Sequence, residues 1–236
     1  MAIVNNHPEE TREALLKNDP KLSTKEVVID DKYAAVASEA SVQATKASLE
    51  TKGHEVTILK TKEEAYEFLK KLIPEGCSIN NGHSTTLEEI GFIEYLKTAT
   101  EWENIHAQVL AEKDMGKQME IRRTKGSTVD YYLSSASAIT EDGVIVGCDL
   151  SGTRVGPWAS TAGKLIIVSG SNKIVKNEEE ANERVYKYSL ELESARVRLA
   201  YKLPASNVVN YSVIKHANPF NPKRVHVVLI NESLGY

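Results

Sequence analysis

Hydrophobic and polar residues follow two different periods along the chain, and segments of the two kinds alternate. Apolar residues repeat at helical spacing in segments such as 62–73, where Ala65, Leu69 and Leu72 share one face. Between such segments lie short apolar runs of strand length. The pattern predicts helices over 7–19, 33–52, 62–73 and 113–123, and one long helix after Asn177. It predicts strands over 54–59, 77–80, 106–110, 143–148, 164–169 and 224–231, and at the end of the run 129–139. This order is typical of an α/β fold.

The segment 134–173 carries the densest pattern of strands and polar loops. Three apolar runs alternate in it with the glycine-bearing loops TEDG, DLSGTRVG and SGSNK. Strands that end in such loops build ligand sites at one edge of a sheet. We therefore expect the loops 81–85, 140–143, 149–154 and 170–173 to converge at the carboxyl ends of parallel strands. The candidate residues in this segment are Ser137, Thr140, Glu141, Asp149, Gly152, Thr153, Arg154, Gly170, Asn172 and Lys173.

The loop NNGHSTTLEEIGF, residues 80–92, provides a second group of candidates. Thr85 and Glu88 have the spacing of a capping box that begins a helix, and the free amide groups there could receive an anion. His83 lies at the mouth of that loop. The site candidates are Asn81, Gly82, His83, Ser84 and Thr85. Alternatively, these residue types only complete the turn, a common role for them.

Three residues of the central segment have chemistry suited to an anion, and each has a structural alternative. Arg154 offers a planar fork of donors that matches a carboxylate or phosphate, or it pairs with Asp149. Lys173 follows a strand and could neutralise an anion, or it is a surface lysine. Glu141 could be a catalytic carboxylate beside the small residues 134–137, or it belongs only to a tight turn.

Composition places the chain among ordinary globular proteins. Its 236 residues are 41% hydrophobic and 26% charged, and the net charge of −4 argues against a nucleic-acid surface. No apolar run is long enough to cross a membrane, and the polar, acidic start of the sequence is unlike a signal or transit peptide. Cys77 and Cys148 lie in apolar runs, as buried thiols of a reducing compartment do. We expect a soluble cytoplasmic protein.

Several familiar site motifs are missing from the sequence. It contains no GxGxxG fingerprint, Walker A loop, HExxH, paired CxxC or GxSxG elbow. The six histidines are scattered, and their spacing does not predict a zinc site. We therefore expect no metal and no bound cofactor.

Several motifs resemble those of the lactate-utilisation (LUD) domain family. They are SAITEDG, DLSGTRV, and SGSNKIV followed by EEA, together with the earlier GHSTTLEEIGF and the final VVLINESLGY. The resemblance covers roughly residues 25–236 and leaves 1–24 as an N-terminal helical extension. It implies a three-layer, Rossmann-like α/β fold of the NagB/RpiA/CoA-transferase-like type, with a mostly parallel open sheet. It also implies a role near the oxidation of lactate or a similar small acid, where some members are subunits beside iron–sulfur proteins.

The sequence departs from the family pattern at two places. Members commonly have DGTGNRV where residues 149–155 read DLSGTRV, which changes the expected ligand contacts. Some relatives with a similar C-terminal segment carry a cysteine cluster before the last strand, whereas residues 204–223 contain no cysteine. An iron–sulfur or zinc site is therefore not expected there.

Two functions of different classes fit these observations. The first is a transferase-like or isomerase-like enzyme that acts on a small carboxylate or phosphorylated metabolite without a redox cofactor of its own. Glu141 would be its acid, base or nucleophile, by analogy with transferases of the superfamily. The second is a non-catalytic binding or accessory subunit of a metabolic complex. In either case we expect a small anionic ligand, and a homodimer that covers the long loop 204–223.

Overall fold

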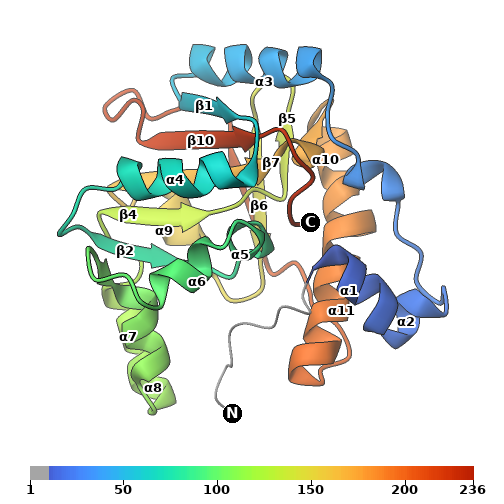
Figure 1. The fold of residues 1–236 in the computed structure, drawn as a ribbon, viewed down its shortest axis with the longest axis horizontal. Coiled ribbons are helices and arrows are strands. Elements are labelled where there is room, and N and C mark those ends of the chain that lie inside the picture. The colour runs from blue at the N-terminus through green and yellow to red at the C-terminus, as the bar shows by residue number, and fades with distance from the viewer. Residues whose placement is uncertain (1–10) are drawn as a thin grey trace.

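The computed structural model describes residues 11–236, which build a six-stranded sheet in which every pair is parallel. Figure 1 shows this sheet, here called sheet A, with helices on both sides. In spatial order its strands are β1 (Glu55–Leu59), β10 (Val225–Ile230), β7 (Lys164–Gly170), β4 (Tyr131–Ser134), β2 (Ser78–Asn81) and β3 (Glu103–Asn104). The prediction of an open, mostly parallel α/β sheet is confirmed.

The central strands of sheet A are buried on both faces, which explains their unbroken apolar sequences. In β7, Leu165 and Ile167 face one core while Ile166 and Val168 face the other, and all four are at most 1% exposed. A strand buried on both faces has no polar alternation. The two apolar runs KLIIVS and RVHVVLIN are therefore typical of inner strands of a sheet, which is where β7 and β10 lie.

Three helices cover one face of sheet A: α4 (Lys62–Leu72), α5 (Thr85–Glu89) and α6 (Phe92–Leu96). The Thr61 side chain caps α4 by accepting a hydrogen bond from the amide of Glu64, as threonine commonly does at a helix start. Ala65 and Leu69 of α4 are fully buried against the sheet. The helical period read from the sequence thus gives the face that packs on the sheet.

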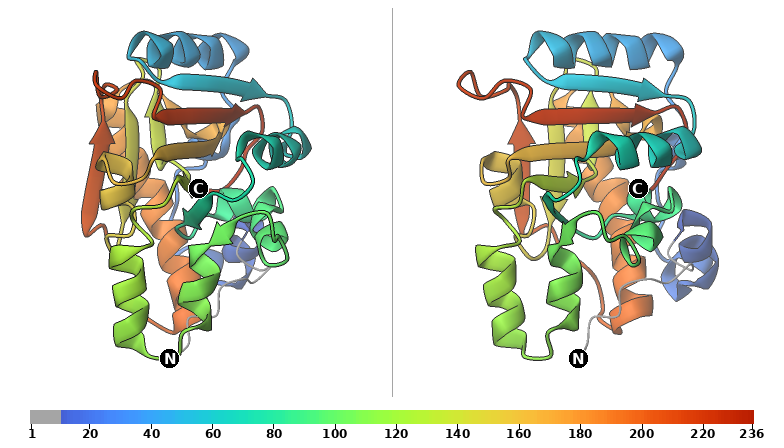
Figure 2. Two further views of the ribbon diagram at one scale, coloured as in Figure 1. Left: turned by 90° about the vertical axis from the view of Figure 1, so that its left-hand side faces the viewer. Right: turned by 60° about the vertical axis from the view of Figure 1, so that its left-hand side comes forward.

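The opposite face of sheet A carries a second sheet, sheet B, together with α3 (Glu39–Thr51) and α9 (Val155–Ala159). Figure 2 shows sheet B behind the first sheet, with its strands running across those of sheet A. Its spatial order is β8 (Ile174–Val175), β5 (Ala138–Thr140), β6 (Ile145–Asp149) and β9 (Asn210–Ile214). Only the pair β5–β8 is parallel, because β6 pairs antiparallel with both β5 and β9.

The outer face of sheet B packs on the long C-terminal helical segment. This segment comprises α10 (Glu178–Arg184), the π-helical turn η3 (Val185–Ser189) and α11 (Leu190–Tyr201). Asn177 caps it as predicted, by accepting a hydrogen bond from the amide of Glu180. The short helices α1 (Arg12–Asn18) and α2 (Pro20–Ser23) pack on α11, where Asp19 accepts two hydrogen bonds from Arg198.

Four predicted elements differ from the structure. Residues 106–110 are not a strand but lie in α7 (Ile105–Ala111), since Asn104 caps that helix and Ile105 and Val109, four residues apart, are both buried. The loop 204–223 contains β9, whose residues are alternately half-buried and exposed and so lack a strong apolar signal. The helix predicted over 33–52 is divided into η1 (Asp31–Ala34) and α3, which starts after the cap Ser38. The helix predicted over 7–19 is α1, and its first residues, 7–10, lie outside the described part of the chain.

The remaining helix, α8 (Met115–Thr124), is close to the prediction for 113–123. Cys77 and Cys148 are free thiols. Among residues 11–236, no helix has both the length and the apolar composition that a membrane crossing requires.

Trp158 of α9 connects the two sheets. Its indole nitrogen donates a hydrogen bond of 3.0 Å to the Ser134 hydroxyl at the end of β4, while its ring lies on Gly147 of β6. A methyl group at position 147 would lie only 2.4 Å from the ring. The ring is 1% exposed and has no free space to move into.

We expect Gly147→Ala to destabilise the fold by about 1–3 kcal/mol, because the added methyl overpacks this contact. Urea unfolding measures the change. Gly116→Ala in α8 is the matched control, since Gly116 is exposed and its nearest neighbour is the exposed Asp114 side chain, at 3.2 Å rather than 2.4 Å. The control should be neutral or stabilising by about 0.5–1 kcal/mol through helix propensity. Equal effects of the two substitutions would contradict the packing argument.

Candidate functional site

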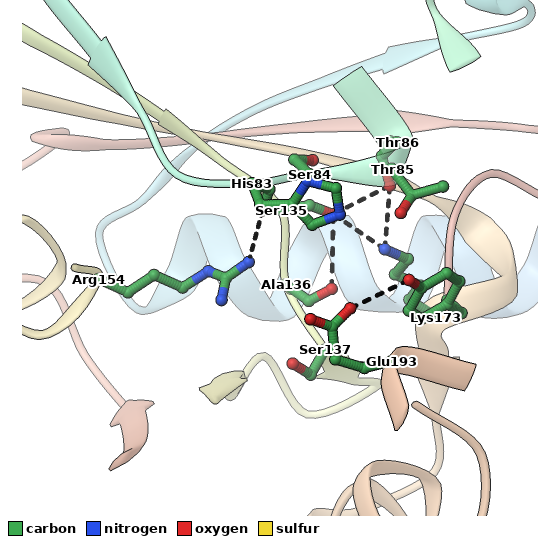
Figure 3. A pocket seen from close by; sticks show the side chains of 11 residues that line it. His83, Ser84, Thr85, Thr86, Ser135, Ala136, Ser137, Arg154, Lys173 and Glu193 are labelled. Carbon is green, nitrogen blue, oxygen red and sulfur yellow. Dashed lines mark hydrogen bonds between the residues drawn. The ribbon is translucent and has the colours of Figure 1, made fainter. Parts of the chain in front are cut away.

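A polar cavity of about 60 Å³ lies where three strands of sheet A end. Its walls come from the segment after β2, the segment after β4, the short helix η2 (Ser171–Lys173) after β7, and α11. Figure 3 shows its lining side chains. They are His83, Ser84, Thr85, Thr86, Ser135, Ala136, Ser137, Arg154, Lys173, Glu193 and Tyr236. The carboxyl ends of parallel strands thus meet around one space.

Lys173 is the most buried charged side chain of this cavity. It is 2% exposed, and its amine donates hydrogen bonds of 3.0 Å each to the Thr86 and Ser135 hydroxyls. Among residues 11–236, no carboxylate lies within ion-pair distance of Nζ. The Lys173 nitrogen has four tetrahedral positions, of which one is the bond to Cε and two are the hydrogen bonds to Thr86 and Ser135. The fourth position has no protein partner in the described chain. That position is available to a ligand in the cavity.

Burial lowers the pKa of Lys173 well below its usual value, and the positive charge of Arg184 adds to the effect. The charged form loses its hydration in this site, so it is less favourable here than in an exposed lysine. Thr86 also donates to the Leu234 carbonyl at 3.3 Å and is 3.2 Å from the Ser135 hydroxyl. The lysine, threonine and serine therefore form one hydrogen-bonded group.

Arg154 holds two loops together at the other side of the cavity. Its guanidinium donates to the Cys148 carbonyl at 2.8 Å and to the His83 carbonyl at 2.9 Å. The Arg154 amide, rather than its side chain, donates to Asp149. The guanidinium fork is thus engaged by the backbone, and its remaining nitrogen, Nε, is buried without a partner in the described chain.

His83 lines the cavity as a neutral imidazole. Burial lowers the pKa of His83 to about 3, with further lowering by the positive charge of Arg196. Its Nδ1 lies 3.4 Å from the Glu88 carboxylate. At neutral pH this ring contributes hydrogen bonding to the cavity but no positive charge.

Glu193 places a carboxylate at the cavity, where Arg196 neutralises it and Tyr236 donates a further hydrogen bond. Arg196 donates to both of its oxygens, at 2.9 and 2.6 Å, and the Tyr236 hydroxyl donates at 3.1 Å. Desolvation by itself raises the pKa of Glu193, but the hydrogen bonds and charge of Arg196 outweigh it and lower the pKa. The carboxylate therefore stays ionised and paired.

The segment 231–236 closes the cavity beside Lys173. Asn172 fixes it through both ends of its amide, which donates to the Gly235 carbonyl at 3.2 Å and accepts from the Leu234 amide at 3.1 Å. The Gly235 amide donates to Glu89 at 2.8 Å. Gly235 has a φ of +58°, and a methyl group there would lie 2.5 Å from the Thr86 hydroxyl and 3.2 Å from Nζ of Lys173. Glycine is therefore required to leave the amine its space.

The structure does not bring Glu141 to the cavity. Glu141 follows β5 in the tight turn of the β5–β6 hairpin, and its carboxylate accepts a hydrogen bond of 2.5 Å from Ser41 of α3. Thr140 also belongs to this turn, where its hydroxyl accepts from the Val144 amide. The expected convergence of loop 140–143 with the other three loops is wrong, because the antiparallel pairing of β5 and β6 turns this hairpin toward α3.

Some of the other predicted residues line the cavity, and the rest hold the surrounding loops in place. Ser84, Thr85 and Ser137 line the cavity, but the predicted capping box at Thr85 is wrong by one residue, since Ser84 caps α5 by accepting from the Leu87 amide. The five-residue helix is therefore capped by the protein itself. The supporting residues, which hold the loops in place without lining the cavity, are Asn81, Gly82, Asp149, Gly152, Thr153, Gly170 and Asn172.

Five lining residues were not predicted: Thr86, Ser135, Ala136, Glu193 and Tyr236. Thr86 follows the predicted Thr85, and Ser135 and Ala136 lie one or two positions before the predicted Ser137, so extending the two loops by that much would have found them. Glu193 follows the pattern of a solvated helix face, and Tyr236 lies far from the other loops in sequence. Only the packing of α11 and of segment 231–236 reveals these two.

The cavity residues supply nitrogen and hydroxyl groups rather than a set of metal ligands. Within residues 11–236 no group of three or more histidine, cysteine, aspartate or glutamate side chains could hold a metal ion. The geometry instead suits a small polar or anionic molecule, bound by an amine, hydroxyls and a neutral imidazole.

The fold and this site define an α/β protein with a small polar cavity at the carboxyl ends of its parallel strands. The sequence model of the LUD domain matches residues 42–230. The chain belongs to the LUD domain family, as its motifs indicated. No curated protein matches it.

Among solved structures, the chain is similar to a DUF162 family protein from Deinococcus radiodurans. The TM-score is 0.50 at 10% sequence identity, over 83% of this chain and 99% of that chain. At this identity the likeness concerns the fold alone. A ribose 5-phosphate isomerase from Plasmodium falciparum has a TM-score of 0.36 at 13% identity, over 72% of this chain and 92% of that chain.

We expect Arg154→Lys to lower the stability of the protein by about 1–3 kcal/mol, because one ammonium cannot replace the fork that satisfies two carbonyls. Thermal and urea unfolding measure the loss. Arg123→Lys, on the exposed face of α8, is the matched control and should change little. Unchanged unfolding of Arg154→Lys together with weaker ligand binding would instead assign Arg154 to the ligand.

Proposed function

We propose that the cavity binds a small monocarboxylate, with Lys173 as the group that meets the carboxylate. The observation that carries this proposal is the buried Lys173 amine at the cavity wall, which has two hydroxyl partners and one open position. Burying a lysine without a carboxylate partner is unfavourable unless a ligand supplies the opposite charge. Membership of the LUD domain family supports a role related to lactate utilisation.

The size of the cavity supports a small ligand. One buried water needs on the order of 10–15 Å³, so a cavity of about 60 Å³ has room for roughly four to six heavy atoms. A hydroxy or oxo acid of three carbons is of this size.

The charges around the cavity also support an anion. Arg196 already neutralises Glu193, and His83 is neutral. Arg154 donates to two backbone carbonyls, which leaves its positive charge at the cavity wall without a carboxylate partner in the described chain. The protonated form of the Lys173 amine adds a charge that can balance one carboxylate.

The second candidate function is a non-catalytic binding or accessory subunit of a metabolic complex, which would use the same cavity to hold a metabolite. Glu141 lies outside the cavity lining, so the geometry gives no support to a catalytic role for its carboxylate. Catalysis in this site would have to use Lys173, Ser135 or His83.

We expect lactate binding to take up a proton at pH values between the lowered pKa of Lys173 in the free protein and its pKa in the complex, because the negative charge of lactate raises that pKa. Titration calorimetry in buffers of different ionisation enthalpy measures this uptake. Lys173→Met should weaken binding by about 1.5–3 kcal/mol, the range of a charge-assisted hydrogen bond, which is roughly ten- to a hundredfold. Inorganic phosphate should bind more weakly than lactate.

Glu141→Gln is the control that distinguishes a ligand site at Lys173 from a ligand site near Glu141. We expect this variant to bind lactate as the wild type does, since Glu141 contacts Ser41 rather than the cavity. If Lys173→Met binds normally while Glu141→Gln does not, the proposed site is refuted and the ligand lies near the β5–β6 turn.

We also propose that the chain forms a homodimer through β9. This strand pairs only with β6 among the described elements, so its other edge is open, as Figure 2 shows for the strand at the side of the molecule. Tyr211 and Val213 are each 39% exposed on it. An open edge with exposed apolar side chains favours pairing with a second copy.

Light scattering over a range of concentrations should give the mass of a dimer. Val213→Lys should shift the equilibrium toward the monomer, because a charge on an edge strand disfavours pairing. Lys117→Glu in exposed α8 is a charge-changing control that should leave the mass unchanged. A monomer at every concentration tested would contradict the proposal.

A further inference from the structure

The environment of Lys173 suits a nucleophilic amine as well as an anion anchor. An anchor that stays charged gains from a nearby carboxylate or from water, yet Nζ has only two hydroxyl partners among residues 11–236 and is 2% exposed. Its pKa is lowered by burial and by the neighbouring charge of Arg184. These are the two ways in which a lysine amine is activated for attack on a carbonyl.

The hydrogen-bond directions leave the lone pair of a neutral amine accessible. Thr86 donates its hydroxyl proton to the Leu234 carbonyl, so it accepts from Nζ. Ser135, at 3.0 Å, can accept the second N–H or donate to the lone pair. When the Ser135 hydroxyl donates to Nζ, it occupies the lone pair of the neutral amine. When the hydroxyl rotates and accepts an N–H instead, the lone pair is left for a ligand.

Space beside the amine is kept open by the backbone. Gly235 lies so close that a methyl group there would be 3.2 Å from Nζ, and Asn172 holds this segment from both its oxygen and its nitrogen. Ala136 and Ser137 add small side chains to the cavity lining. These small groups, together with Gly235, leave space in which a trigonal carbon could approach the amine.

We propose that Lys173 forms an imine with the carbonyl group of a small 2-oxo monocarboxylate bound in the cavity. The inference rests on the proposed carboxylate site and adds a covalent step to it. The step uses the neutral form of the Lys173 amine, whereas the protonated form is the one that pairs with a carboxylate. It assigns Ser135 and Thr86 as the hydroxyls that carry protons during that step.

The step balances without any further reactant. The Nζ lone pair attacks C2 of the 2-oxo acid, so an N–C bond forms and the carbonyl electron pair moves to oxygen. A proton passes from nitrogen to that oxygen through the hydroxyl of Ser135 or Thr86, which gives a carbinolamine. The C–O bond then breaks, water leaves with a second proton, and a C=N bond remains. One amine and one carbonyl thus give one imine and one water, with no change of oxidation state.

Reductive trapping tests this inference on the whole wild-type protein. Pyruvate and cyanoborohydride are added together, because cyanoborohydride reduces an imine to a stable secondary amine. Trypsin does not cleave after a modified lysine, so the adduct is expected on the peptide 165–176, with the mass of a reduced pyruvyl group. Exposed Lys117 serves as the internal control for non-specific modification and should remain unmodified when Lys173 is fully labelled.

Two further measurements connect the adduct to the site. Lactate has no carbonyl group, so it should occupy the cavity and suppress labelling at Lys173 without forming an adduct. Ser135→Ala keeps the lysine but removes one proton carrier, and it should slow adduct formation by about a hundredfold, the lower end of what a positioned acid or base contributes. Unfolding curves of this variant show whether it keeps the fold.

The outcomes separate the inference from the proposed function. Lactate binding with no adduct on 165–176, or labelling of Lys117 at the same rate as Lys173, overturns the imine and leaves the carboxylate site standing. No binding of lactate and no adduct overturns both. An adduct on Lys173 that lactate suppresses establishes both.

Discussion

The burial of one amine governs the arrangement of this site. Lys173 lies in the short helix that leads from β7, a central strand of sheet A, into β8 of sheet B, and its side chain is only 2% exposed. Its nitrogen donates hydrogen bonds to the hydroxyls of two other segments, at Thr86 and Ser135. Each of these hydroxyls follows a parallel strand of sheet A, so the geometry of the sheet determines which partners the amine has.

The segment after β10 is shaped around the same group. Asn172, next to the lysine, fixes Leu234 and Gly235 by hydrogen bonds, and the glycine presents backbone rather than a side chain to the amine. Glu89 accepts from the Gly235 amide, and burial raises the pKa of this carboxyl. A carboxylate is thus close enough to influence Lys173 electrostatically, while its hydrogen bond is directed to the backbone. The amine is left without a paired anion of the described chain.

The other charged side chains near the cavity are already committed to protein partners. Arg154 joins the loop after β2 to β6, and Arg196 neutralises Glu193. These hydrogen bonds fix the positions of the loops around the cavity. Arg154 nevertheless keeps its Nε buried without a partner in the described chain, so its positive charge remains at the cavity wall.

The sequence by itself determined the sheet and most of the loops around the cavity. Long runs without polar alternation, such as those of β7 and β10, are buried on both faces wherever they lie, so they predict the centre of a parallel sheet. The loops that follow β2, β6 and β7 are predicted because polar and glycine residues directly after a strand can build a site at the sheet edge. This pattern predicts His83, Arg154 and Lys173, each in one of these loops.

Only the tertiary structure decided which loops meet. Glu141 follows a strand as Lys173 does, but β5 belongs to a second sheet and turns back antiparallel, which carries Glu141 to α3. The weak strand β9 was not predicted because an edge strand is half-exposed, and α7 was not predicted because its apolar run is short. Glu193 and Tyr236 reach the cavity through the packing of α11 and of the segment after β10. Local sequence patterns carry no information on contacts between segments so far apart, because those contacts depend on how the two sheets pack.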